Sequence, residues 1–411
     1  HYTIGFPHEE YQSGRPRIVS PLYDRLKKLN ACFGSKLGWE RPNWFAPAGE
    51  EARDIYTMGR QNWFAAVGEE HRCVRERVGV FDQSSFAKYE LRGKDAEEAL
   101  GWICANNVAR PVGKLTYTQM LNSRGGIECD LTVARLAEDH FYIVTGTGFR
   151  THDFAWIVDH LKPGLAAKLT DITEQYGTLS VMGPKSRAVI QAVTKTDMSN
   201  AAFKFGEVRE IEIAGHKVRA LRVTYVGELG WELHMPIAAT GEVFDALMAA
   251  GKPQGIAPVG YRALESLRLE KGYRAWSSDI TPNDTPLHAG LGWAVKMKSN
   301  QAFLGRAAIE KIAQAPLTKM LAGFTTERED IVLSGRETIL RNGAFAGYLT
   351  SGGYGYTIRK PVGFGYVRNA DGVDEAYLEA GRYELVVAKE IVKANIHLQP
   401  IYDSLNQRVK S

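Results

Sequence analysis

The chain has 411 residues, of which 44% are hydrophobic and 24% are charged, a balance typical of globular proteins. This length exceeds one ordinary core, so we expect two or three structural units. The net charge is only +4 and no run of Lys and Arg stands out, which does not favour a nucleic-acid partner. No stretch approaches the roughly 18 continuous apolar residues of a membrane span, so no membrane partner is expected.

The first 50 residues are predicted to be mostly irregular, with one short helix within PLYDRLKKLNACF (21–33). The segment GWERPNWFAP (38–47) combines aromatic side chains with two prolines, which indicates an ordered loop packed on a domain. The chain begins with His1 rather than Met, and we expect it to be the back part of a longer protein.

Helices and strands are predicted to alternate up to residue 162. Residues 69–82 are predicted to form a helix running into a strand, 87–106 a strand, turn and helix, and 114–146 three strands. Residues 150–162 are predicted to form an amphipathic helix. Its expected apolar positions are Phe154, Ile157, Val158 and Leu161.

The segment GGIECDLTV (125–133) reads as a glycine turn followed by a strand in which apolar and polar residues alternate. Glu128 and Asp130 share the polar face, where like charges repel each other. This face therefore either meets water or lines a site that needs a carboxylate. In a cleft, repulsion and loss of solvent would raise the pKa of Asp130, so that it could exchange a proton near neutral pH.

Residues 176–194 are predicted to form a strand, a turn and a helix, and residues 209–236 three strands. Within them, YVGELGWEL (225–233) carries a Gly-Glu-Leu-Gly turn. Glu228 is expected at an exposed tip of this turn. It is either an ordinary hydrophilic turn residue or a carboxylate that holds N–H donors of a ligand, such as an aminopyrimidine edge.

Two helices are predicted next, within residues 240–251 and 258–273. In the second, Arg268 follows Glu265 by three residues, which is consistent with an internal ion pair. Alternatively, Arg262 or Arg268 binds a ligand carboxylate.

From about residue 318, short strands and hairpin turns such as Asn342–Gly343 predict a small all-β barrel or sandwich. The rest of the chain is of mixed α+β class. The glycine-rich and tyrosine-rich segment 348–367 is either a barrel corner or a loop that caps a flat ligand. In the second case Tyr354 contributes to the cap and Arg359 lies near an anion.

The common short catalytic motifs are absent from the sequence: there is no GxGxxG opening a βαβ unit, no P-loop, no HExxH, no GxSxG and no EF-hand loop. The four cysteines form no CxxC pair and the ten histidines no obvious cluster, so we expect buried free thiols and no metal site.

Taken in order, five segments resemble the folate-binding aminomethyltransferase family, that of the glycine-cleavage T-protein. They are MLNSRGGIECDLTV, LSVMGPKSRAVI, YVGELGWELHMP, SLRLEKGYRAWSSDITPNDTPLHAGLGWAV and GYLTSGGYGYTIRKPVGFGYV. The resemblance covers roughly residues 65–405. In addition, residues 13–47 look like the junction in flavin-dependent dimethylglycine and sarcosine dehydrogenases, where an FAD-containing amine-oxidising half precedes a T-protein-like half.

The resemblance implies an α+β fold with three subdomains around a central folate opening and a C-terminal all-β barrel. The expected division is 1–50 as the end of the amine-oxidising half, 51–300 as two interleaved α+β subdomains that bind folate, and 301–411 as the barrel. It implies transfer of the one-carbon unit of an oxidised N-methyl glycine to tetrahydrofolate, giving 5,10-methylene-tetrahydrofolate. FAD would bind only in a preceding half, which is the implied partner.

The resemblance also assigns roles to residues. Asp130 matches the key acid near the reactive folate nitrogens, Glu228 the acid that grips the pterin, and Tyr225 its neighbour. Either Arg268 or Arg262 would lie near the glutamate tail of the folate. The pterin pocket would be lined by Tyr117, Met120, Val144 and Thr145.

One position departs from the family pattern, because Cys129 stands where the family typically has Asp. Strand alternation turns position 129 toward the core, so Asp130 keeps its role; with a slipped register, Glu128 would take it.

Two other functions are weighed against this one: a non-catalytic regulatory or scaffold relative, and a stand-alone folate-dependent demethylase. The presence of both Asp130 and Glu228 argues against the first, and residues 13–47 argue against the second. The expected compartment is the cytoplasm of a bacterium or the mitochondrial matrix of a eukaryote.

Overall fold

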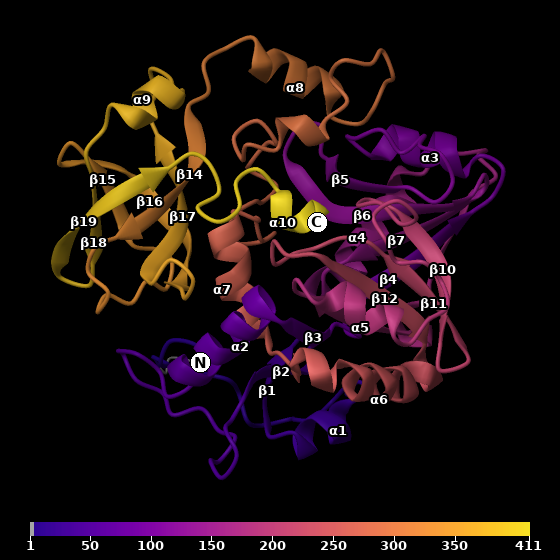
Figure 1. Ribbon diagram of the computed structural model, residues 1–411. Helices are drawn as coiled ribbons and strands as arrows, with labels where there is room; N and C mark the ends of the chain where they lie inside the picture. Colours follow the sequence, from indigo (N-terminus) through magenta and orange to yellow (C-terminus); the bar gives the residue numbers. More distant parts are fainter. Residues whose placement is uncertain (1–3) are drawn as a thin grey trace.

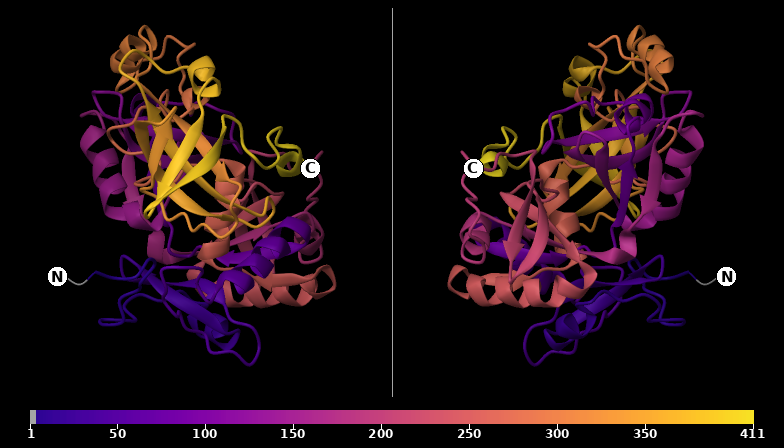
Figure 2. Two further views of the ribbon diagram at one scale, coloured as in Figure 1. Left: turned by 90° about the vertical axis from the view of Figure 1, so that its left-hand side faces the viewer. Right: turned by 90° about the vertical axis from the view of Figure 1, so that its right-hand side faces the viewer.

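The computed structural model describes residues 4–411 and shows two β-sheets flanked by helices, followed by a separate closed barrel (Figure 1). The barrel stands to the left of the two sheets in Figure 1, and the N-terminal elements lie beneath them in the side views of Figure 2. No helix in the described part of the chain has the length and apolar character needed to cross a membrane. The predicted α+β class with a C-terminal barrel is confirmed.

The N-terminal region is more regular than predicted. After the short helix α1 (Tyr23–Lys28), strands β1 (Ala31–Lys36) and β2 (Trp39–Phe45) pair in an antiparallel hairpin. The aromatic segment 38–47 was expected to be a loop and is largely strand β2. Its packing on a domain was correctly predicted, because Trp44 is buried in a cluster with α2 (Phe64–Glu76) and α7 (Tyr261–Lys271).

The first sheet is antiparallel, with the strand order β5-β6-β7-β4-β8. The strands are β4 (Ala87–Arg92), β5 (Leu115–Leu121), β6 (Ile127–Ala137), β7 (His140–Thr145) and β8 (Lys168–Asp171). Helices α3 (Ala96–Ile103) and α4 (Arg150–His160) bury its apolar face. In α4 the predicted apolar positions hold except Val158, which is 44% exposed.

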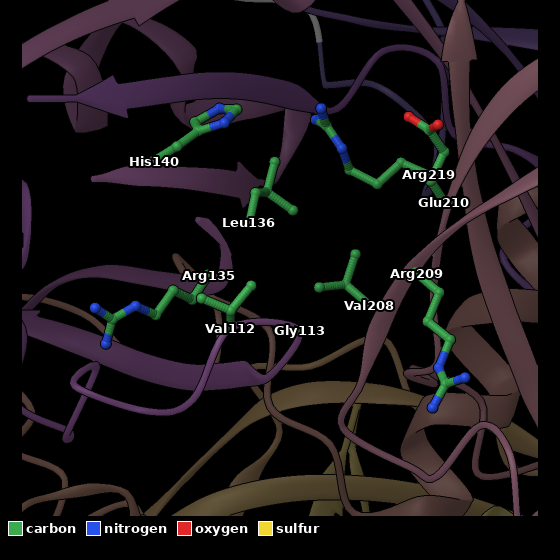
Figure 3. A pocket seen from close by; sticks show the side chains of 9 residues that line it. All are labelled: Val112, Gly113, Arg135, Leu136, His140, Val208, Arg209, Glu210 and Arg219. Atoms are coloured by element: carbon green, nitrogen blue, oxygen red, sulfur yellow. The ribbon is translucent and has the colours of Figure 1, made fainter. Parts of the chain in front are cut away.

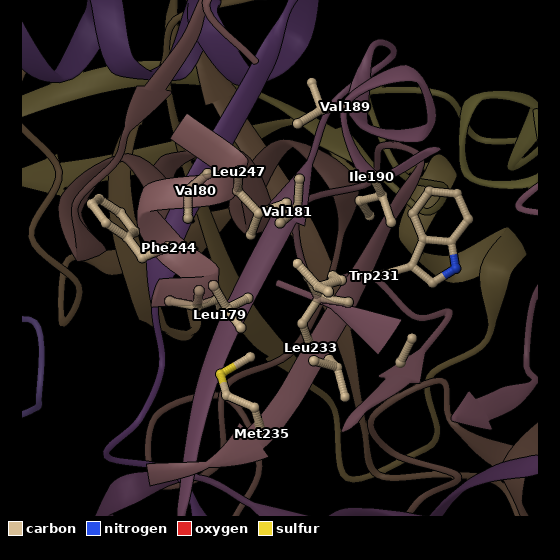
Figure 4. Close-up of a cluster of buried hydrophobic side chains, with 14 of the residues drawn as sticks. Val80, Leu179, Val181, Val189, Ile190, Trp231, Leu233, Met235, Phe244 and Leu247 are labelled. Atoms are coloured by element: carbon tan, nitrogen blue, oxygen red, sulfur yellow. The ribbon is translucent and has the colours of Figure 1, made fainter. Parts of the chain in front are cut away.

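The second sheet has the order β10-β11-β12-β9-β3-β13, with β13 parallel to β3 and the other pairs antiparallel. The strands are β3 (Val78–Asp82), β9 (Tyr176–Met182), β10 (Val208–Ile213), β11 (His216–Leu221), β12 (Gly230–Pro236) and β13 (Ile256–Pro258). One face packs on α5 (Ser186–Gln191) and α6 (Thr240–Gly251) through side chains such as Val181, Leu233 and Leu247 (Figure 4).

The barrel is closed by six strands in the order β14-β17-β16-β15-β18-β19. They are β14 (Lys319–Thr326), β15 (Thr338–Arg341), β16 (Ala344–Gly355), β17 (Lys360–Arg368), β18 (Tyr383–Val387) and β19 (Glu390–His397). The predicted turn at Asn342–Gly343 is present, and both residues have positive φ, as a tight hairpin requires. The helices of this part are α8 (Arg306–Ala313), α9 (Glu375–Glu379) and α10 (Gln407–Lys410). Short 3-10 turns elsewhere are η1 (Thr147–Phe149), η2 (Thr173–Gln175), η3 (Ile237–Ala239), η4 (Lys252–Gln254) and η5 (Gly292–Ala294).

The faces of the two sheets that the helices leave free pack against each other. A small apolar cluster joins them, with Ala134 and Val144 from the first sheet and Val208 and Leu221 from the second. Around it the layer is polar: the Tyr142 hydroxyl lies 2.9 Å from His234 Nδ1 across the layer. We call this region, between β4–β7 and β9–β12, the inter-sheet layer.

One buried carboxyl ties the N-terminal hairpin to the helices. The two Glu70 oxygens each accept a 2.7 Å hydrogen bond, one from the Phe45 N–H and the other from the Gly260 N–H at the start of α7. Burial raises the pKa of Glu70 to about 8, although both hydrogen bonds oppose the shift.

We therefore predict that Glu70 makes stability fall with rising pH. Its folded-state pKa lies above its unfolded value, so its contribution is complete below about pH 4.5 and is lost as the pH rises toward 8, with a slope of up to about 1.4 kcal/mol per pH unit. Urea unfolding of wild type and Glu70→Gln between pH 5 and 8 tests this. A Glu70→Gln chain with the wild-type pH slope would contradict the prediction.

Candidate functional site: the inter-sheet layer

Asp130 lies on the polar face of β6, the face that also carries Ala134 of the cluster between the sheets, as strand alternation predicted. Gln119 Nε2 on the neighbouring strand donates to its Oδ1 at 2.9 Å. Burial raises the pKa of the Asp130 carboxyl to about 6, while hydrogen bonding from Tyr117 and Gln119 works in the opposite direction. Asp130 is thus a carboxyl held in place by neighbours, with a pKa close to neutral pH.

Aromatic side chains surround this carboxyl. The Tyr117 ring stacks on Trp293 with centroids 5.7 Å apart, and the indole is 70% exposed. The Tyr225 ring stacks on Tyr273 at 5.8 Å, and its hydroxyl donates to the Arg274 carbonyl at 2.9 Å. Tyr117, Tyr225 and Asp130 therefore lie near one another, while their roles toward a folate stay predictions. The structure adds neighbours that the sequence analysis missed: Gln119, Arg274 and Trp293.

Glu228 is not at an exposed tip, and that expectation is corrected. It is 1% exposed, and Arg75 Nη1 lies 3.2 Å and Arg408 Nε 2.9 Å from its oxygens, while the Tyr402 hydroxyl also donates to it. Burial raises the pKa of this carboxyl, and the charge of Arg75 opposes the rise. The C-terminal segment has folded over this turn and uses its carboxylate.

Glu232 is a second acid of the segment 225–233, and the sequence analysis did not identify it. On β12, Trp231, Leu233 and Met235 belong to the helix-covered core, so Glu232 and His234 face the inter-sheet layer. The Glu232 carboxylate is 3.5 Å from His234 Nε2. The strand alternation after Gly230 was the signal that could have identified it.

Lys88 on β4 is fully buried, and the charge of Glu232 is among those that act on it. Its Nζ donates to the carbonyls of Ser84 at 2.7 Å and Tyr176 at 2.8 Å. Burial lowers the pKa of its ammonium group to about 7, and the nearby carboxylates, Asp82 first, oppose this. Lys88 pairs with Val144 on β7, and Val144 pairs with Thr132 on β6. Thr132 is two residues from Asp130 along the same strand. On this face of the first sheet the apolar Val144 therefore lies between Lys88 and Thr132.

A cavity of about 350 Å³ opens at the far end of the layer, between β6–β7 and β10–β11. Figure 3 shows Leu136 and Val208 toward its middle, with His140 and Arg219 along one wall. Its arginines already face carboxylates; Arg209, for example, donates to Glu207 at 3.2 Å. None of the site residues predicted from the sequence lines this cavity.

The comparison with known proteins settles the family. The family model described as the GCVT N-terminal domain matches residues 22–299, and that of the glycine cleavage T-protein C-terminal barrel domain matches residues 319–403. The chain belongs to the glycine-cleavage T-protein family. Aminomethyltransferase T from Bartonella henselae has the same fold, with a TM-score of 0.80 at 26% identity over 94% of this chain and 99% of that one.

Two relatives with curated names, both dehydrogenases, are longer than this chain. Mouse mitochondrial sarcosine dehydrogenase is 37% identical over 100% of this chain and 49% of its own length. Mouse mitochondrial dimethylglycine dehydrogenase is 37% identical over 89% of this chain and 42% of its own length. The chain thus spans about half the length of these relatives. Both relatives are enzymes, which agrees with the predicted enzyme class.

The two arginines predicted to hold a ligand carboxylate are engaged within the protein. Arg268 is 1% exposed and donates to Asp279 at 2.6 Å, to Ser351 Oγ at 2.8 Å and to Glu265. Arg262 forms a bidentate pair with Asp54, at 2.7 and 2.9 Å. For Arg268 the internal ion pair, which was the alternative interpretation, describes what is observed.

The predicted pterin-pocket residues fall on both faces of the first sheet. Val144 faces the inter-sheet layer. Met120 is buried in the helix-covered core, and its place in a pterin pocket stays a prediction. Thr145 also faces the helices, where its hydroxyl donates to Asp153 at 2.6 Å.

Tyr354 and Arg359 lie apart from this group, at the barrel end that contacts α2. The Tyr354 ring packs edge-on against Phe64, with centroids 5.0 Å apart. Arg359 is exposed in the turn between β16 and β17. The barrel-corner interpretation fits both positions.

We predict that Arg268 is structural. Replacing it by Met leaves the fully buried Asp279 without its cation, which should lower the free energy of unfolding by about 3–5 kcal/mol. Urea unfolding measures the loss, and the exposed Arg359→Ala serves as control, with an expected change within about 0.5 kcal/mol. Equal midpoints for Arg268→Met and wild type would show that this network is not structural.

Proposed function

We propose that the inter-sheet layer binds a reduced folate and that the chain transfers a one-carbon unit to it. The observation that carries the proposal is Asp130: a carboxyl supported by Gln119 and Tyr117 on a polar surface inside a protein of the T-protein family. Carboxyl groups with a pKa near neutrality can take and return protons at working pH.

The proposed donor is the iminium formed when an N-methyl glycine is oxidised, and the acceptor is tetrahydrofolate. One folate nitrogen attacks the iminium carbon, and the second displaces the amine, which gives 5,10-methylene-tetrahydrofolate. Two folate N–H protons end on the departing amine. Asp130 takes such a proton and returns it, and a partly enclosed layer protects the iminium from hydrolysis to formaldehyde.

The pterin of this folate presents N–H donors that a carboxylate can accept in pairs. Glu228 remains the acid predicted for this role by resemblance, but its oxygens already accept from Arg408 and Tyr402. Glu232 faces the layer, and its oxygen lies 3.5 Å from His234. On this geometry we propose Glu232 as the pterin-holding acid.

We propose, further, that an FAD-containing half of the same protein or a partner subunit supplies the iminium. The support is that the chain spans about half of sarcosine dehydrogenase. The compartment would be the mitochondrial matrix in a eukaryote or the cytoplasm in a bacterium.

The role of Asp130 is tested by separating binding from transfer. We predict that Asp130→Asn keeps folinic acid affinity within about threefold of wild type, because the amide preserves shape, and lowers transfer from formaldehyde to tetrahydrofolate by roughly 100-fold or more. Calorimetry measures the first and absorbance of the methylene product the second. A wild-type chain that binds no folate would favour the non-catalytic relative, and unchanged transfer in Asp130→Asn would remove Asp130 from the chemistry.

The two candidate acids are told apart by a matched pair. Glu232→Gln should weaken folinic acid binding by about 10-fold or more, since a carboxylate that accepts two hydrogen bonds is lost. Glu228→Gln should lower the urea midpoint and leave the dissociation constant of the folded chain near that of wild type. If Glu228→Gln weakened folinic acid binding and Glu232→Gln only lowered the urea midpoint, Glu228 would be the pterin-holding acid.

A further inference from the structure

A cluster of three metal-ligating side chains lies on the other face of β6 from Asp130. Cys129 points to the helix-covered side, and His152 and Asp153 lie in the first turn of α4 that packs there. One potential ligand atom of each lies within 4.8 Å of the others. The sequence showed no such cluster, because residues 129 and 152 are distant along the chain and share no short motif.

Further polar groups contact the side chains of this cluster. His152 Nδ1 lies 2.9 Å from Asp153 Oδ1, and the other Asp153 oxygen accepts from the Thr145 hydroxyl at 2.6 Å. The second ring nitrogen of His152 is 3.5 Å from Glu128 Oε2. Metal-binding histidines are commonly oriented in this way, by a carboxylate on the nitrogen that does not bind the metal.

The charges around the cluster are unbalanced. Asp153 is 1% exposed, and Glu128 is partly buried nearby. Within residues 4–411, His152 is the only basic side chain at ion-pair distance from either carboxylate. Two carboxylates therefore share one imidazole, and a buried carboxylate without a full positive partner is costly. A bound cation would supply the missing charge.

We propose that Cys129, His152 and Asp153 form a binding site for a divalent transition-metal ion, with Zn²⁺ as the expected occupant. A thiolate, an imidazole and a carboxylate are a ligand set that Zn²⁺ accepts, whereas Mg²⁺ and Ca²⁺ prefer oxygen alone. Bond lengths of roughly 2.0–2.3 Å in a tetrahedral site place ligands roughly 3–4 Å apart, which needs only a small contraction here. The side chain of His152 is 42% exposed and gives the ion a route of entry.

Binding would replace protons by the metal. The Cys129 thiol and the His152 ring nitrogen that faces Asp153 each release a proton to solvent as they bond to the ion, and no oxidation or reduction takes place. The competing arrangement has no metal, and the thiol simply donates a hydrogen bond to Asp153. The two arrangements differ in metal stoichiometry, which can be measured directly.

The experiment is a titration of the metal-free full chain with Co²⁺, followed by displacement with Zn²⁺. We expect one equivalent of Co²⁺ with a thiolate-to-cobalt absorption band that Zn²⁺ removes. Glu128→Gln should weaken affinity by roughly 10–100-fold, and His152→Asn by more than that. Cys129→Ser should abolish the band, whereas Cys104→Ser, a change to another buried thiol of the same core, should keep it.

The proposal is overturned if the wild-type chain binds no stoichiometric Co²⁺ or Zn²⁺, or if His152→Asn binds them as tightly as wild type. His152→Asn keeps the test decisive if Cys129→Ser fails to fold, because residue 152 is on the exposed side of α4. Folinic acid binding measured on the same samples separates failure of the metal site from failure of the proposed folate site.

Discussion

The structure depends on what covers the two faces of each sheet. Each sheet buries one apolar face under helices, α3 and α4 on the first and α5 and α6 on the second. The remaining faces must then meet each other, and they carry groups such as Lys88, Asp130 and Glu232. Buried ionisable groups are costly unless they are paired or serve a ligand. An ordinary sandwich would have filled this layer with apolar side chains.

Other buried networks keep the parts in fixed positions around that layer. Glu270 on α7 accepts from Arg75 at 3.0 Å and from the Thr357 N–H of the barrel at 2.7 Å. Arg268 joins the same helix to Ser351 in the barrel. Because these contacts are buried and charge-assisted, they hold the barrel against the body of the protein. The residues around Asp130 are therefore positioned by a rigid frame.

Much of this arrangement could be predicted from the sequence, because strand periodicity and turn chemistry act locally. The strands of 114–146, the barrel and the face of Asp130 followed from such patterns. The hairpin at Ala31–Phe45 did not, since prolines and charges obscure its alternation. The burial of Glu228 depends on Arg408, which is far away in the chain. The pairing of Arg262 with Asp54 likewise joins residues that are distant in the sequence. The division of the chain at residues 50 and 300 stays a prediction.

The central claim is that the inter-sheet layer holds the folate, and a crystal structure of the chain with folinic acid tests it most directly. The account predicts electron density for the pterin between the two sheets, within contact distance of Asp130 and with its amino edge toward Glu232. Density confined to the cavity beside Arg209 and Arg219, or on the barrel near Arg359, would contradict it.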